Sequence, residues 1–259
     1  MKLGQTLIFF GIVFTIYGLI NFYLFKRILS VIPASFKSAT SIILIFIILS
    51  YIAGRVLENF WISHISDFLV WLGAFWIAIM FYAFLLVVLI DLVRLLNHFL
   101  PFLPAALIKS PEKLKRTCAL IVSVLVFIAV AGGFFNSKMI AEKKYTLAIN
   151  KKAGKLKTLN IVMVSDLHLG TIIGNKFLEH VVSRINNLKP DIILFAGDVI
   201  DEDIKPVLKD NFGATLLKLK SKYGVYAVTG NHEYIGGVNE AVNYLREHGI
   251  TMVRDEALL

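Results

Sequence analysis

Three short stretches in the second half of the chain decide its fold: residues 161–168 read IVMVSDLH, 192–201 read IILFAGDVID and 225–233 read VYAVTGNHE. In each stretch, an apolar run rich in β-branched or aromatic residues leads directly into a polar cluster. Apolar runs of this length, bounded by turn residues, are typical of buried β-strands. Because a helical pattern separates the first two runs, we predict β-α-β units with a mostly parallel sheet.

We expect four strands, at 161–164, 191–196, 225–229 and 250–253. Apolar residues recur at helical spacing over 177–188, and Pro190 marks the end of this crossover helix. A second helix is expected at 238–248, ending at Gly249, because glycine readily takes the left-handed conformation that closes helices. His248 is then expected at the surface.

The polar clusters follow the strands directly, and parallel α/β sheets form their sites at the carboxyl ends of strands. The candidate residues are carboxylates, imidazoles and one amide: Asp166, His168, Asp198, Asp201, Asn231 and His232. Their oxygen and nitrogen donors suit divalent ions such as Mn, Fe or Zn, and one Asp can bridge two ions. Each cluster alone is also common as a turn or a helix cap. Their order, spacing and position together favour a metal pair.

The same clusters resemble the first three signature motifs of calcineurin-like metallophosphoesterases: DLH at 166–168, GDVID at 197–201 and GNHE at 230–233. The resemblance covers about 159–255, and the residues flanking the motifs resemble the membrane-anchored bacterial branch of that family. It implies an αββα sandwich. The family's later histidine and its Gly-His-x-His motif are not in this chain, so we expect an incomplete domain with one apolar sheet face uncovered.

The resemblance also implies a ligand set for two divalent metal ions. Asp166 and His168 would bind the first ion and Asp198 would bridge both. Asn231 would bind the second ion through its amide oxygen. With the later motifs missing, each ion is expected to be short of protein donors.

The proton donor is implied in the same way. His232 would be the general acid, oriented by Asp201, whereas Glu233 would act at the helix start or behind the ligands. The implied reaction is hydrolysis of a phosphate mono- or diester or a pyrophosphate. A lipid-linked substrate, such as a UDP-diacylglucosamine-type pyrophosphate, is one expectation. The alternatives are a non-catalytic membrane protein whose head is a binding module, and a lipid sensor that docks a partner.

The first half of the chain is too apolar for a water-soluble domain. The whole chain is 57% hydrophobic with a mean hydropathy of +0.73. We predict four membrane spans, near 3–25, 41–57, 68–90 and 118–135, because about 17 to 25 helical residues cross a bilayer. The first span lacks a small-residue cleavage site and is expected to be retained rather than removed as a signal peptide. Trp61, Trp71, Trp76 and Tyr82 around the third span are expected to face lipid or headgroups.

The predicted organisation has three parts. Residues 1–137 form the membrane domain, 138–158 a basic linker with a short strand at 145–149, and 159–259 the head. The apolar residues of 99–108 are too few to span and are expected in the membrane interface. The chain has one cysteine, Cys118, so it can form neither an intrachain disulfide nor a cysteine-based metal site.

Charge points to the membrane rather than to nucleic acid. Lys and Arg outnumber Asp and Glu by 13 to 5 over 1–145 and by 14 to 13 over 146–259, so +8 of the net +9 flanks the apolar segments. The spans hold almost no ionisable residue, which disfavours a transporter. Most of these cations lie in the first-to-second and third-to-fourth connections: Lys26, Arg27, Lys37, Arg94, Lys109, Lys113, Lys115 and Arg116. The positive-inside rule places those connections in the cytoplasm and favours an extracytoplasmic head.

Overall fold

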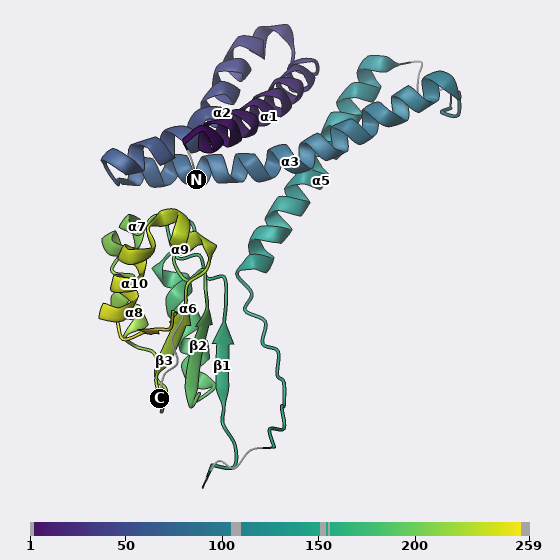
Figure 1. Ribbon diagram of the computed structural model, residues 1–259. Coiled ribbons are helices and arrows are strands. Elements are labelled where there is room, and N and C mark those ends of the chain that lie inside the picture. Colours follow the sequence, from purple (N-terminus) through teal and green to yellow (C-terminus); the bar gives the residue numbers. More distant parts are fainter. Residues whose placement is uncertain (1–2, 105–109, 151–153, 155, 255–259) are drawn as a thin grey trace. The chain divides into compact units, whose positions relative to one another are not determined.

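The computed structural model describes residues 3–104, 110–150, 154 and 156–254 (Figure 1). The chain divides into two compact units, Met1–Ser137 and Lys138–Leu259. In its described residues the first unit contains helices joined by short connections: α1 (Leu3–Leu29), the 3-10 turn η1 (Ala34–Phe36), α2 (Lys37–Phe60), α3 (His64–Phe99) and α5 (Pro111–Ser137). Its four long helices have mean hydropathies between 2.1 and 2.7 and are long enough to cross a membrane. The expectation of four spans is therefore confirmed on length and composition.

Glycines allow α2 and α3 to approach each other closely. A Cβ added at Gly73 would lie 2.3 Å from the backbone nitrogen of Tyr51, and one added at Gly54 would lie 2.7 Å from that of Val70. Small residues are a common way for membrane helices to bring their backbones together. Ser63 precedes α3 and caps it, exchanging hydrogen bonds with Ser66 through both backbone nitrogens.

A buried polar contact joins α1 to α3. Trp76 Nε1 donates to Asn21 Oδ1 at 2.9 Å, and Asn21 Nδ2 donates to Met80 Sδ at 3.1 Å and to the Tyr17 carbonyl at 2.9 Å. The Asn21 and Trp76 side chains are both buried. The expectation that Trp76 faces lipid is wrong, because its indole N–H finds its acceptor inside the helix bundle.

Two predictions between the units need correction or a limit. No strand forms at 145–149, and Tyr145, Leu147 and Ile149 are 80%, 83% and 74% exposed. The alternation of apolar residues there is strand-like, but no neighbouring strand pairs with it. Of the segment predicted for the membrane interface, 100–104 is non-helical and 105–109 lies outside the described residues.

The head contains one four-stranded parallel sheet in the order β1 (Ile161–Val164), β2 (Ile192–Ala196), β3 (Val225–Val228) and β4 (Thr251–Met252). These strands agree with the predicted ones to within two residues. The helices of the head are α6 (Asn175–Asn187), α7 (Lys205–Lys209), α8 (Phe212–Leu216), α9 (Asn231–Gly236) and α10 (Val238–Glu247).

The two faces of the sheet differ. On one face, Phe195 of β2 and Ala227 of β3 are buried in a single core with the apolar sides of α6, α8 and α10. On the other, Ile161, Met163 and Val228 remain 48%, 69% and 44% exposed, so an apolar face is uncovered, as expected.

His248 is not the surface residue expected from the sequence. It is half-buried, its ring centroid lies 4.2 Å from that of Tyr244, and its Nδ1 lies 2.7 Å from the Tyr244 carbonyl oxygen. The ring also leaves no space for a side chain at Gly213. His248 therefore closes the end of α10 against α8.

Candidate active site

The loops after β1 and β2 continue the pairing of their strands. His168 N donates to the Asp198 carbonyl at 2.9 Å, Leu169 N to Val199 at 2.9 Å, and Asp201 N to Leu169 at 3.0 Å. Both polar clusters are thereby held in register beyond the sheet edge. Backbone hydrogen bonds between the two loops therefore fix where their side chains begin.

Left-handed backbone occurs at three of the predicted metal ligands. Asp166, His168 and Asp198 have φ angles of 56°, 47° and 51°. Among the described residues, five non-glycine residues have positive φ, so three of the five lie in this site. Such conformations cost about 1–3 kcal/mol each and persist where the surroundings hold them, often at functional sites.

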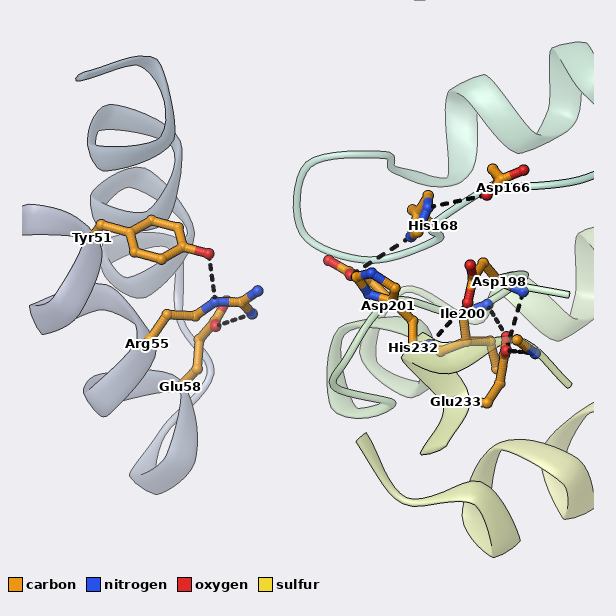
Figure 2. A network of polar contacts seen from close by, with 11 residues as sticks. Tyr51, Arg55, Glu58, Asp166, His168, Asp198, Ile200, Asp201, His232 and Glu233 are labelled. Atoms are coloured by element: carbon orange, nitrogen blue, oxygen red, sulfur yellow. Dashed lines mark hydrogen bonds and ion pairs between the residues drawn. The ribbon is translucent and has the colours of Figure 1, made fainter. Parts of the chain in front are cut away.

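Two overlapping groups of side chains could hold metal ions. The ligand atoms of Asp166, His168 and Asp198 all lie within 4.8 Å of one another, and so do those of His168, Asp201 and His232. His168 Nε2 lies 3.9 Å from Asp166 Oδ1, and its Nδ1 lies 3.9 Å from Asp201 Oδ1. Figure 2 shows the His168 ring between these two carboxylates. All these donors are oxygen or imidazole nitrogen atoms, a set that suits Mn, Fe or Zn.

His232 is held from two sides. Its Nδ1 lies 3.0 Å from Asp201 Oδ1, and its backbone N–H donates to Asp198 Oδ1 at 2.8 Å. Its ring meets that of His168 edge to face, with centroids 4.4 Å apart. With Nδ1 directed at a carboxylate, the other ring nitrogen, Nε2, is the atom that can exchange a proton with a substrate.

The Glu233 carboxylate links the loop after β2 to the loop after β3. Its side chain is 1% exposed. One oxygen accepts from the backbone N–H groups of Asp198 at 3.1 Å and Gly230 at 2.7 Å, and the other accepts from Ile200 at 3.0 Å (Figure 2). This agrees with the expected role at the helix start and behind the ligands. The sequence did not reveal that one carboxylate fixes two loops.

The third loop requires glycine where it passes Asp198. A Cβ at Gly230 would lie 2.3 Å from Asp198 Oδ1, and one at Gly197 would lie 2.9 Å from Gly230. Asn231 follows as the first residue of α9, and its side chain is exposed. Asn231 thus lies in the sequence between Gly230, which passes close to Asp198, and His232, whose backbone N–H donates to Asp198. Within the described part of the chain, the Asn231 side chain makes no hydrogen bond.

Comparison with known proteins agrees with this geometry. The family model for calcineurin-like phosphoesterases matches residues 159–255. The chain is 31% identical to an uncharacterised metallophosphoesterase of Campylobacter jejuni over 93% of its own length and 63% of the relative's. It thus spans less than two thirds of that relative. No solved structure matches significantly.

Two further relatives match less than half of the chain. A Bos taurus transmembrane protein with a metallophosphoesterase domain is 34% identical over 48% of the chain and 27% of its own length. A UDP-2,3-diacylglucosamine pyrophosphatase of Chlamydia trachomatis is 34% identical over 36% of the chain and 28% of its own length. The strand order, the three polar loops and these matches lead to one assignment: residues 159–255 form a calcineurin-like phosphoesterase domain.

Proposed function

We propose that the protein is a membrane-anchored phosphoesterase that uses two divalent metal ions to hydrolyse a phosphate mono- or diester or a pyrophosphate. The observation that carries the proposal is the convergence of Asp166, His168 and Asp198 within 4.8 Å of one another, beside the His232–Asp201 pair. The Chlamydia relative is named for a lipid-linked pyrophosphate. A lipid-linked substrate is therefore the version of the proposal that we favour.

Each ligand has a position in this scheme. Asp166 and His168 would hold the first ion, and Asp198 would lie between the two ions because its carboxylate has two oxygens. Asn231 would offer its amide oxygen to the second ion from the start of α9. Ions of this kind supply Lewis acidity to a phosphate group and neutralise its charge.

The proton needed by the leaving oxygen would come from His232. Asp201 Oδ1 lies 3.0 Å from its Nδ1 and would fix the ring orientation, so that Nε2 is left for the substrate. General acid catalysis of this kind contributes typically about 10²- to 10⁴-fold in rate. Glu233 would act indirectly, by keeping the Asp198 and Gly230 backbones in place.

Four single crossings would put the head on the same side of the membrane as the α2–α3 turn. The α1–α2 and α3–α5 connections, on the opposite side of the membrane, carry more Lys and Arg residues than the α2–α3 turn. By the positive-inside rule, we therefore propose an extracytoplasmic head. The membrane and a phosphoester substrate are then the expected partners, and nucleic acid is not. A reporter fused after residue 259 tests this topology, and a cytoplasmic readout would refute it.

The catalytic test uses the whole protein in lipid nanodiscs with Mn and bis-p-nitrophenyl phosphate. His232→Asn is expected to lower turnover by about 10²- to 10⁴-fold while bound metal, measured by mass spectrometry, stays unchanged. Asp198→Asn is expected to lower both turnover and metal content. His180→Asn, at an exposed position of α6, is the matched control.

The alternative is a head that folds but does not catalyse. It would gain support if the wild-type protein bound no divalent ion and hydrolysed no phosphoester with Mn, Fe or Zn. Hydrolysis that survived both His232→Asn and Asp198→Asn would place the chemistry elsewhere.

A further inference from the structure

The fourth strand brings a cation to the edge where the three acidic loops lie. β4 is parallel to β3, with Ala227 opposite Met252, and Val253 N donates to the Ala227 carbonyl at 2.8 Å. The pairing thus continues one residue past β4. Arg254 is the next residue, and this register places it beside Thr229, directly before the loop that carries Asn231 and His232.

The Arg254 guanidinium lies against an aromatic ring of the active-site helix. Its Cζ lies 6.0 Å from the centroid of Tyr234, which is two residues after His232 in α9. The Tyr234 hydroxyl in turn lies 3.4 Å from Thr229 Oγ1. Tyr234 and Arg254 therefore lie together beside the loop that carries Asn231 and His232.

Within the described residues, both side chains reach the protein surface. Tyr234 is 59% exposed and Arg254 is half-buried. Within the described part of the chain, no carboxylate lies at ion-pair distance from Arg254, whereas Arg184 and Arg55 each have one, at 2.9 Å and 3.1 Å. A guanidinium keeps its charge at any physiological pH and can form two parallel hydrogen bonds to a phosphate.

We propose that Arg254, held against Tyr234, forms a subsite for a second phosphate group of the substrate, next to the phosphate that is cleaved. This deepens the proposed function and rests on it. The metal ligands can hold one phosphate group, and the subsite adds a fixed positive charge beyond them. The substrate class it selects is a diphosphate, such as a nucleotide or lipid diphosphate ester, over a simple phosphodiester.

The subsite predicts that Arg254 contributes to affinity and not to the chemical step. Arg254→Gln should remove the second phosphate's partner and weaken binding of a diphosphate ester by about 10- to 100-fold, the usual range for a charge-assisted contact. Arg254→Lys should retain part of the affinity, because lysine keeps the charge but not the paired geometry. Tyr234→Phe should have little effect, whereas Tyr234→Leu should loosen the guanidinium.

The test measures binding by calorimetry to the whole Mn-loaded protein in nanodiscs. The two ligands are UDP-glucose, which has two phosphate groups, and the methyl ester of uridine 5′-monophosphate, which has one. The wild type should prefer UDP-glucose by about tenfold or more, and Arg254→Gln should remove this preference without changing affinity for the methyl ester. Arg246→Gln, at an exposed position of α10, is the control and should behave as wild type.

The outcomes separate this subsite from the proposed function. Turnover of bis-p-nitrophenyl phosphate reports the proposed function, and Arg246→Gln, which lies outside the subsite, should turn it over within twofold of wild type. A wild type without preference for UDP-glucose, or an Arg254→Gln protein that loses affinity for both ligands equally, would overturn the subsite while leaving the phosphoesterase proposal intact. Absence of turnover in the wild type would instead count against the proposed function.

Discussion

Replacing Glu233 with glutamine tests whether one buried carboxylate holds the active-site loops together. The change keeps the size and shape of the side chain but turns one oxygen into an N–H donor. The carboxylate accepts from three backbone N–H groups, at Asp198, Ile200 and Gly230. An amide can serve either the Asp198–Gly230 pair or Ile200, but not both sides.

The smallest loss follows if the amide oxygen keeps the Asp198–Gly230 pair. The Ile200 N–H then faces the new NH2 group and loses its acceptor in a buried position. A charge-assisted hydrogen bond contributes about 1.5–3 kcal/mol, and a buried donor without a partner costs a similar amount. Glu233→Gln should therefore lower the free energy of local opening at this loop by about 1.5–3 kcal/mol.

Hydrogen exchange on the whole protein in nanodiscs measures this opening directly. Peptides that include Ile200 should exchange roughly 10- to 150-fold faster in Glu233→Gln than in wild type, because each 1.4 kcal/mol is a factor of ten. Glu247→Gln, at an exposed position of α10, should leave the same peptides unchanged. Equal exchange in Glu233→Gln and wild type would show that backbone pairing alone holds the loops and that this reasoning is wrong.

Two other predictions concern packing in each unit. Gly73→Ala should push α2 and α3 apart, because its Cβ would lie 2.3 Å from Tyr51 N. The free energy of unfolding in detergent should then fall by about 1–3 kcal/mol. Gly132→Ala, with no atom within 4 Å of the added Cβ, should leave it unchanged. Tyr244→Phe should speed exchange at Gly213 about 5- to 150-fold, because the hydroxyl accepts that N–H at 2.7 Å. Burial also raises the pKa of Tyr244 above its usual 10.0, so in wild type its contribution to stability is present below pH 10 and should fall as the pH rises beyond it, a loss absent in Tyr244→Phe.

The sheet and the gathering of the site were predictable because both follow from local patterns. Each strand is a short apolar run, and each polar cluster begins where a run stops. Parallel pairing then brings the clusters to one edge without any further information. The contact between Asp201 and His232 was expected from the family resemblance, and the structure places their atoms 3.0 Å apart.

The errors arise where the partner of a residue decides its state. Residues 145–149 alternate like a strand, but a strand exists only with a neighbour to accept its hydrogen bonds. Trp76 looks like an interface aromatic until Asn21 on another helix offers its indole an acceptor. His248 packs against Tyr244 one turn earlier in α10, and it becomes half-buried only because the end of α10 packs against Gly213 of α8.

The left-handed residues show a further limit of sequence reasoning and explain how the site is built. Aspartate and histidine tolerate positive φ better than most residues, but nothing in the motif announces that Asp166, His168 and Asp198 all adopt it. The conformation turns each loop back toward the sheet edge, and ladder hydrogen bonds together with Glu233 hold it there. A site assembled this way would hold the proposed metal ligands through backbone contacts alone. Its geometry should consequently survive removal of the metal, whereas loss of Glu233 should disturb it even with metal present.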